Sequence, residues 1–197
     1  MSSVKFALKA EAAGVDAIVC EGFEAGGHNG REETTTFTLI PMVKEQVKIP
    51  VIAAGGIGSG RGMLAAMVLG ADGVQIGSRF AATEESSAHI NFKNTIVDVK
   101  DGDTHLTLKE LAPVRLVKNK FYEEVQELYQ QNPSIEKIKE LLGRARAKKG
   151  MFEGDLENGE LEIGQIAGLI HQIKPAKEVL NDIIEEYNLV KSLIVSI

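Results

Sequence analysis

The chain has 197 residues, of which 44% are hydrophobic and 25% are charged, enough for one substantial core and a small appendage. Its formal net charge of −6 argues against a nucleic-acid-binding protein, because phosphate neutralisation requires dense lysine and arginine. The single cysteine, Cys20, excludes an intrachain disulfide, and no apolar run approaches the roughly 20 residues of a membrane span, so we expect a cytoplasmic protein.

The first 85 residues alternate helical and extended patterns. The run 50–54 contains no polar residue, which is typical of a parallel strand buried on both faces. Strands and helices that alternate in this way predict an α/β fold with a parallel sheet. We expect strands over 17–20, 50–54 and 74–76, and helices from Val4 to a stop at Gly14, over 38–46 and over 60–69.

Beyond about residue 85 the pattern becomes mainly helical. Ser134 is a good N-cap residue, and the span 154–164 is rich in turn-forming residues. We therefore divide the chain into residues 1–85 and a helical appendage over 86–197. Helices are expected over 88–100, 119–131, after Ser134, in the basic stretch 143–150, and over 165–173 and 175–191. The apolar faces of Phe121–Tyr129 and Leu180–Leu193 are expected to be buried within the chain.

Two glycine-rich loops follow the second and third expected strands, AAGGIGSGRG (53–62) and GVQIGSR (73–79). Glycine lets the backbone approach a ligand closely, and the start of a helix offers unpaired N–H groups to an anion. The loops predict a phosphate site, with Gly60 and Gly62 at the start of the third helix and with Gly77 and Ser78 donating from the second loop. The alternative is that the glycines only shape tight turns.

The first strand ends in the loop AGGHNG, which places His28 near Glu21 and Glu24 in the sequence. An imidazole titrates near neutral pH and suits a general base, although a capped surface histidine is the alternative. His89, His105 and His171 show no metal-ligand spacing, so we expect no metal site.

Four segments together resemble the nitronate monooxygenases, formerly called 2-nitropropane dioxygenases. They are EGFEAGGHNG (21–30), PVIAAGGIGSGRG (50–62), GADGVQIGSRF (70–80) and GQIAGLI (164–170). This family of flavoproteins shares a fold with enoyl-ACP reductase II. The resemblance implies the C-terminal portion of an FMN-binding TIM (β/α)8 barrel, with its last three βα units in residues 1–85 and a helical appendage after them.

The resemblance also implies roles for particular residues. His28 would be the active-site histidine and the base in nitronate oxidation. Glu21 and Gly26 would line the flavin, and Gly164 and Gln165 would lie near its edge. The residues expected to hold the FMN phosphate and ribityl chain are Gly56, Gln75, Ile76, Gly77 and Ser78.

Three functions follow from this resemblance. The first is FMN-dependent oxidation of alkyl nitronates by oxygen, and the second is reduction of a trans-2-enoyl thioester with NAD(P)H, as in enoyl-ACP reductase II. The third is a non-catalytic half-barrel that is stable only in an oligomer. Because the family's first five strands have no counterpart here, we expect a C-terminal fragment that alone binds FMN weakly or not at all. The expected partner is a small-molecule substrate, with no nucleic acid or membrane.

Overall fold

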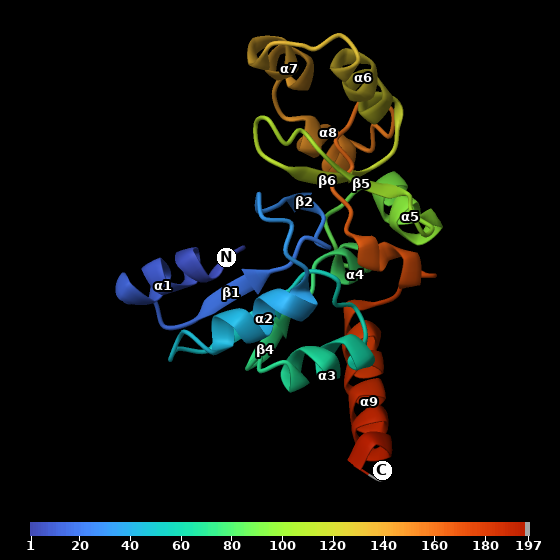
Figure 1. The fold of residues 1–197 in the computed structure, drawn as a ribbon. Coiled ribbons are helices and arrows are strands. Elements are labelled where there is room, and N and C mark those ends of the chain that lie inside the picture. Colours follow the sequence, from blue (N-terminus) through green and yellow to red (C-terminus); the bar gives the residue numbers. More distant parts are fainter. Residues whose placement is uncertain (196–197) are drawn as a thin grey trace.

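The computed structural model describes residues 1–195 and contains two three-stranded sheets with helices around them (Figure 1). A parallel sheet has the order β1-β3-β4, formed by β1 (Ile18–Glu21), β3 (Val51–Ala54) and β4 (Gly73–Gln75). Cys20 of β1 is in register with Ala53 of β3, which is in register with Val74 of β4. The three expected strands and their parallel pairing are confirmed, with ends displaced by one residue.

The helices that alternate with these strands also lie close to their expected positions. They are α1 (Val4–Ala12), α2 (Thr36–Lys44) and α3 (Gly60–Val68), and Gly14 follows α1 with a φ of +86°. Leu39, Ile40 and Val43 of α2 are fully buried against Cys20 and Val51 of the sheet. Burying a side chain of this size stabilises the fold by about 1.5–3 kcal/mol, so the packing of α2 contributes strongly to the stability of this sheet.

A second, antiparallel sheet, which the sequence did not predict, includes residues of the segment 104–117. It has the order β2-β6-β5, with β2 (Gly27–His28), β5 (Thr104–Thr107) and β6 (Val114–Val117). His28 is paired with Val114 and Gly27 with Arg115, so the AGGH segment is held as a short strand. Arg115 is almost fully buried, and its Nε donates to the Phe23 carbonyl at 3.0 Å, which joins this sheet to the loop after β1.

The helices between residues 90 and 153 gather around the second sheet. Figure 1 shows two of them, α6 (Lys120–Tyr129) and α7 (Ile135–Leu142), at the end of the molecule farthest from the C-terminal helix α9 (Ala176–Val195). The others are α5 (Ile90–Asp98) and α8 (Arg146–Glu153). The Ser134 hydroxyl accepts a hydrogen bond from the Lys137 N–H, which confirms the expected cap. Phe121 and Val125 of α6 are buried, as expected for that face.

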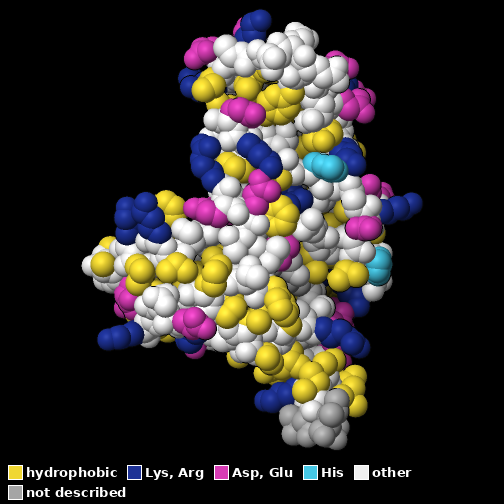
Figure 2. All heavy atoms as spheres, viewed as in Figure 1, with side chains coloured by type: hydrophobic (Ala, Val, Ile, Leu, Met, Phe, Trp, Pro, Cys, Tyr) yellow, Lys and Arg dark blue, Asp and Glu magenta, His cyan; other side chains and the backbone are white. Residues whose placement is uncertain are grey.

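The chain ends in the short 3₁₀ helix η1 (Gln165–Leu169) and in α9 (Ala176–Val195). α9 packs along α3, although the two helices are more than 100 residues apart in sequence (Figure 1). The apolar face from Leu180 to Leu193 was expected to be buried, and this is wrong for much of it. Leu180, Leu189 and Leu193 are more than half exposed, and Figure 2 shows hydrophobic side chains near this end of the molecule.

The proposed division at about residue 85 therefore falls between parts that share many contacts. β2 from the first part pairs with β6 from the second, and α9 covers α3. None of the described helices is both long enough and apolar enough to span a membrane.

Candidate active site

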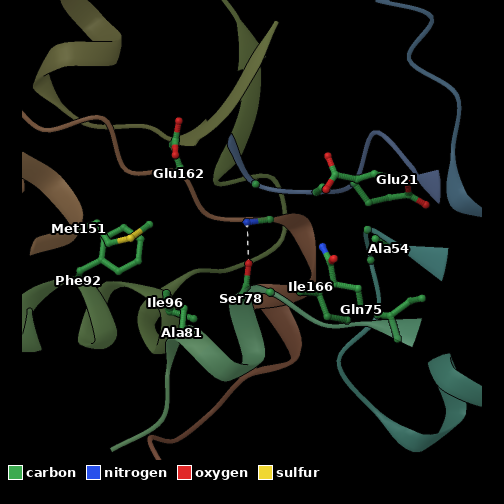
Figure 3. Close-up of a pocket in the computed structure, with 18 residues that line it drawn as sticks. Glu21, Ala54, Gln75, Ser78, Ala81, Phe92, Ile96, Met151, Glu162 and Ile166 are labelled. Atoms are coloured by element: carbon green, nitrogen blue, oxygen red, sulfur yellow. Dashed lines mark hydrogen bonds between the residues drawn. The ribbon is translucent and has the colours of Figure 1, made fainter. Parts of the chain in front are cut away.

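A cavity of about 250 Å³ opens at the carboxyl ends of β1, β3 and β4 (Figure 3). Parallel strands bring their C-terminal loops to one edge of a sheet, which is where α/β proteins place their ligands. The helix α4 (Ser78–Ala81), η1, α5 and α8 complete the wall. The lining residues are Glu21, Glu24, Ala25, Gly26, Ala54, Gly55, Gly56, Ile57, Gln75, Gly77, Ser78, Ala81, Phe92, Ile96, Met151, Glu162, Gly164 and Ile166.

Close packing of the loops explains two of the glycines. A Cβ on Gly26 would lie 2.5 Å from the Gly164 nitrogen, so these two segments meet backbone to backbone. Gly55 has a φ of +90°, and a Cβ there would lie 2.6 Å from the Gly22 carbonyl oxygen. Only glycine satisfies both the backbone conformation and the space at this second position.

Three groups at one end of the cavity could hold a phosphate. In the described part of the chain, no residue accepts a hydrogen bond from the N–H of Gly56 or Gly77. The Ser78 hydroxyl accepts from the Gly164 N–H at 3.0 Å, which leaves its own hydrogen available for a ligand (Figure 3). A Cβ added at Gly77 would meet nothing within 4 Å. Free donors and open space fit a phosphate group.

The predicted contribution from the start of α3 is wrong. The Glu186 carboxylate of α9 accepts hydrogen bonds from the Gly60 N–H at 2.7 Å and the Arg61 N–H at 3.3 Å. The Gly62 N–H donates to the Ser59 hydroxyl at 3.1 Å. A carboxylate is a good partner for the positive end of a helix, so α9 itself occupies the site that the sequence suggested for an anion.

Three carboxylates line the cavity, but they differ in what holds them. Both oxygens of Glu24 accept from the Thr36 N–H at 3.0 Å, so Glu24 caps the start of α2. Burial raises the pKa of Glu21, which lies at the end of β1 beside Ala54 of β3 (Figure 3). Burial also raises the pKa of Glu162, against an opposing influence from His28.

His28 is outside the cavity. Its side chain is 70% exposed, and its Nδ1 lies 3.6 Å from Oε1 of Glu162, whose side chain is only 18% exposed. Glu162, and not His28, contributes to the lining. Sequence reasoning missed Glu162 because the segment that carries the family resemblance starts two residues later, at Gly164.

The structure brings most of the predicted site residues together. Glu21, Gly26, Gly56, Gln75, Gly77 and Ser78 all line the cavity. Ile76 does not, because its side chain packs against the core of the parallel sheet. Gly164 lines the wall, and the Gln165 N–H donates to the Glu24 carbonyl at 2.9 Å.

An apolar part of the wall was also missed. Phe92 and Ile96 of α5, Met151 of α8 and Ala81 of α4 form it, on the opposite side from Glu21 and Gln75 (Figure 3). These residues belong to helices whose sequence pattern shows burial but not a ligand. Within residues 1–195, no group of three or more histidine, cysteine, aspartate or glutamate residues is arranged to hold a metal ion.

Two solved structures are similar to this chain over nearly its whole length. Among solved structures, FabK from Thermotoga maritima is 43% identical with a TM-score of 0.92, covering 100% of this chain and 62% of its own. Nitroalkane oxidase from Streptomyces ansochromogenes is 29% identical with a TM-score of 0.80, covering 98% of this chain and 57% of its own.

Curated relatives and a family profile point the same way. A probable nitronate monooxygenase from Staphylococcus aureus strain JH9 is 37% identical, and one from Staphylococcus saprophyticus is 34% identical. These matches cover 95% and 91% of this chain but only 55% and 56% of the relatives, so the chain spans about half their length. The family profile described as nitronate monooxygenase matches residues 1–186. The chain belongs to the nitronate monooxygenase family.

Proposed function

We propose that this chain forms part of an FMN-dependent oxidoreductase that oxidises alkyl nitronates with oxygen. The observation that carries the proposal is the cavity at the ends of the parallel strands, in a member of this family. The N–H groups of Gly56 and Gly77 and the hydroxyl hydrogen of Ser78 have no acceptor there among residues 1–195. We further propose that β1, β3 and β4 are the last three strands of a TIM barrel. The similarity to FabK and nitroalkane oxidase, which extends over about three fifths of their chains, supports this.

The residues of the cavity would have different roles in binding FMN and the substrate. The Gly56 and Gly77 N–H groups and the Ser78 hydroxyl would hold the FMN phosphate, while Gly26, Glu21 and Gln75 would lie along the flavin. Bound FMN supplies the redox chemistry by accepting electrons from the substrate. The apolar wall would receive the alkyl group of the substrate and exclude water. His28, on the AGGH strand and 3.6 Å from Glu162, would take part in proton transfer through that carboxylate and not by direct contact with the substrate.

The phosphate site can be tested with Gly77→Ala. Because a Cβ here meets no protein atom within 4 Å, the substitution should leave the unfolding free energy unchanged. The methyl group should crowd the phosphate and weaken FMN binding by about tenfold, the equivalent of one hydrogen bond. Quenching of FMN fluorescence measures this, even if the 197-residue chain binds weakly. Gly62→Ala, outside the cavity, is the control, and equal affinities for the two variants would contradict the proposed cradle.

The function itself is tested by oxygen consumption with ethyl nitronate. The second candidate, an enoyl-ACP reductase II that uses NAD(P)H, is favoured by the 43% identity to FabK. Oxidation of NADH with a crotonyl thioester, measured under argon, tests that alternative. We expect turnover of the nitronate, and turnover of the thioester alone would select the second candidate. A protein that binds FMN but turns over neither substrate would contradict both.

A further inference from the structure

Glu162 and His28 form a pair at the edge of the cavity, and only a side chain that reaches the cavity can contact a bound substrate. Glu162 lines the cavity, whereas His28 lies behind it with a largely exposed ring. We infer that Glu162 is the proton acceptor that faces the substrate and that His28 is its partner on the solvent side. This inference rests on the proposed function, because it assumes a substrate with an acidic C–H in the same cavity.

The backbone around Glu162 is fixed on both sides. The Leu161 carbonyl accepts from the Val117 N–H at 3.0 Å, and the Gly164 N–H donates to the Ser78 hydroxyl at 3.0 Å. Leu161 and Ile163 are buried in the core on either side of Glu162. Such anchoring keeps a reactive side chain in place, as proton transfer requires.

Gly27 makes room for this carboxylate. Its φ is +80°, and a Cβ at this position would lie 3.3 Å from the Glu162 carboxyl carbon and one of its oxygens. A larger residue would therefore press on the carboxylate as well as strain the strand. The second glycine of the AGGH segment thus permits the contact between His28 and Glu162.

The charges around Glu162 suit a proton acceptor. His28 faces it from β2, and the buried Glu160, which interacts with both Glu162 and Arg146, lies two residues earlier in the same segment. Burial raises the pKa of Glu162 and so makes it a stronger base than an exposed glutamate.

The step is a simple proton transfer. With a neutral nitroalkane, the C–H bond next to the nitro group breaks, its electron pair moves onto the nitro group to give the nitronate, and the proton binds a Glu162 oxygen. His28 then takes the proton from Glu162 and exchanges it with water. A preformed nitronate has already lost this proton and needs no base.

The test compares Glu162→Gln with Glu157→Gln, a control that removes the same charge from an exposed side chain. In the oxidase assay, the activity of E162Q with nitroethane should fall by at least about 100-fold, whereas its activity with ethyl nitronate should fall by less than about threefold. The activity of His28→Asn should fall by about tenfold, and only with nitroethane, because the role of His28 is to relay the proton.

A second measurement does not depend on the redox reaction. Proton NMR in D2O under argon follows exchange of the nitroethane C–H, and we expect catalysis by the wild type and E157Q but not by E162Q. Any of three results would overturn the inference. They are exchange retained in E162Q, no exchange above buffer in the wild type, and equal losses of E162Q activity with both oxidase substrates. If the wild type exchanges nitroethane but does not oxidise ethyl nitronate, the proposed function fails while the role of Glu162 stands.

Discussion

Gly60→Ala is expected to destabilise the protein by about 3 kcal/mol, as overpacking against immovable neighbours does. A Cβ at this position would lie 2.2 Å from the Tyr187 nitrogen and 2.4 Å from the Ile183 carbonyl oxygen. Both are backbone atoms of α9, so the whole helix would have to move away from α3. That movement would also expose Ile183 and pull Glu186 from the first turn of α3. Urea unfolding followed by circular dichroism measures the loss.

Gly62→Ala is the matched control, because it makes the same chemical change in the same turn of α3. The nearest atom to its Cβ would be the Ser59 hydroxyl oxygen at 3.5 Å, an ordinary contact. Alanine favours a helix over glycine by about 1 kcal/mol, so this variant should be as stable as the wild type or slightly more stable. A Gly60→Ala protein within 1 kcal/mol of the Gly62→Ala protein would show that α9 does not need the close contact with α3.

The sequence predicts the parallel sheet well because the signal is local. The apolar run that becomes β3 and the glycines that end α1 and α3 fix each element within a few residues. The start of α3 is mispredicted for the opposite reason. Glu186 reaches Gly60 from 126 residues away, and nothing near Gly60 in the sequence shows that its N–H has a partner.

In the candidate site, too, the features with a local sequence signal are predicted and those that depend on distant contacts are not. Its glycine loops are recognisable because each follows a strand, and they do line the cavity. Phe92 and Met151 have the pattern of ordinary apolar helix residues. The strands β5 (THLT) and β6 (VRLV) bury threonine and arginine side chains, so neither shows the uninterrupted apolar run that marks β3. The separation of His28 from the cavity follows from the pairing of β2 with β6, which no local pattern reveals.

Glu160 should make the stability of the protein depend on pH. The side chain is buried, and its Oε1 has no hydrogen-bond partner among the described residues. Burial, and then the nearby Glu162 charge, raise the pKa of Glu160 to about 7, while Arg146 partly opposes them. The folded protein therefore holds a proton on this group over a pH range in which the unfolded chain, with a pKa of 4.5, has released it.

The sign of the effect follows from this difference. The contribution of Glu160 to stability is fully present below pH 4.5 and is lost as the pH rises through about 7, because the buried carboxylate must then carry its charge. The shift corresponds to roughly 3 kcal/mol. Glutamine cannot ionise, so the unfolding free energy of Glu160→Gln minus that of the wild type should grow by about this amount between pH 5 and pH 8.5.

Other shifted groups do not obscure this measurement. The raised pKa of Glu21 and the lowered pKa of Asp72 are present in both proteins, so they largely cancel in the difference. Glu162 interacts with Glu160, so its response to the substitution is part of the measured difference. Glu157→Gln, which removes an exposed charge nearby, should give a curve parallel to that of the wild type. The unfolding free energy of Glu160→Gln could instead run parallel to that of the wild type between pH 5 and pH 8.5. Glu160 would then be ionised in the folded protein at pH 5, and groups other than Arg146 would stabilise its buried carboxylate.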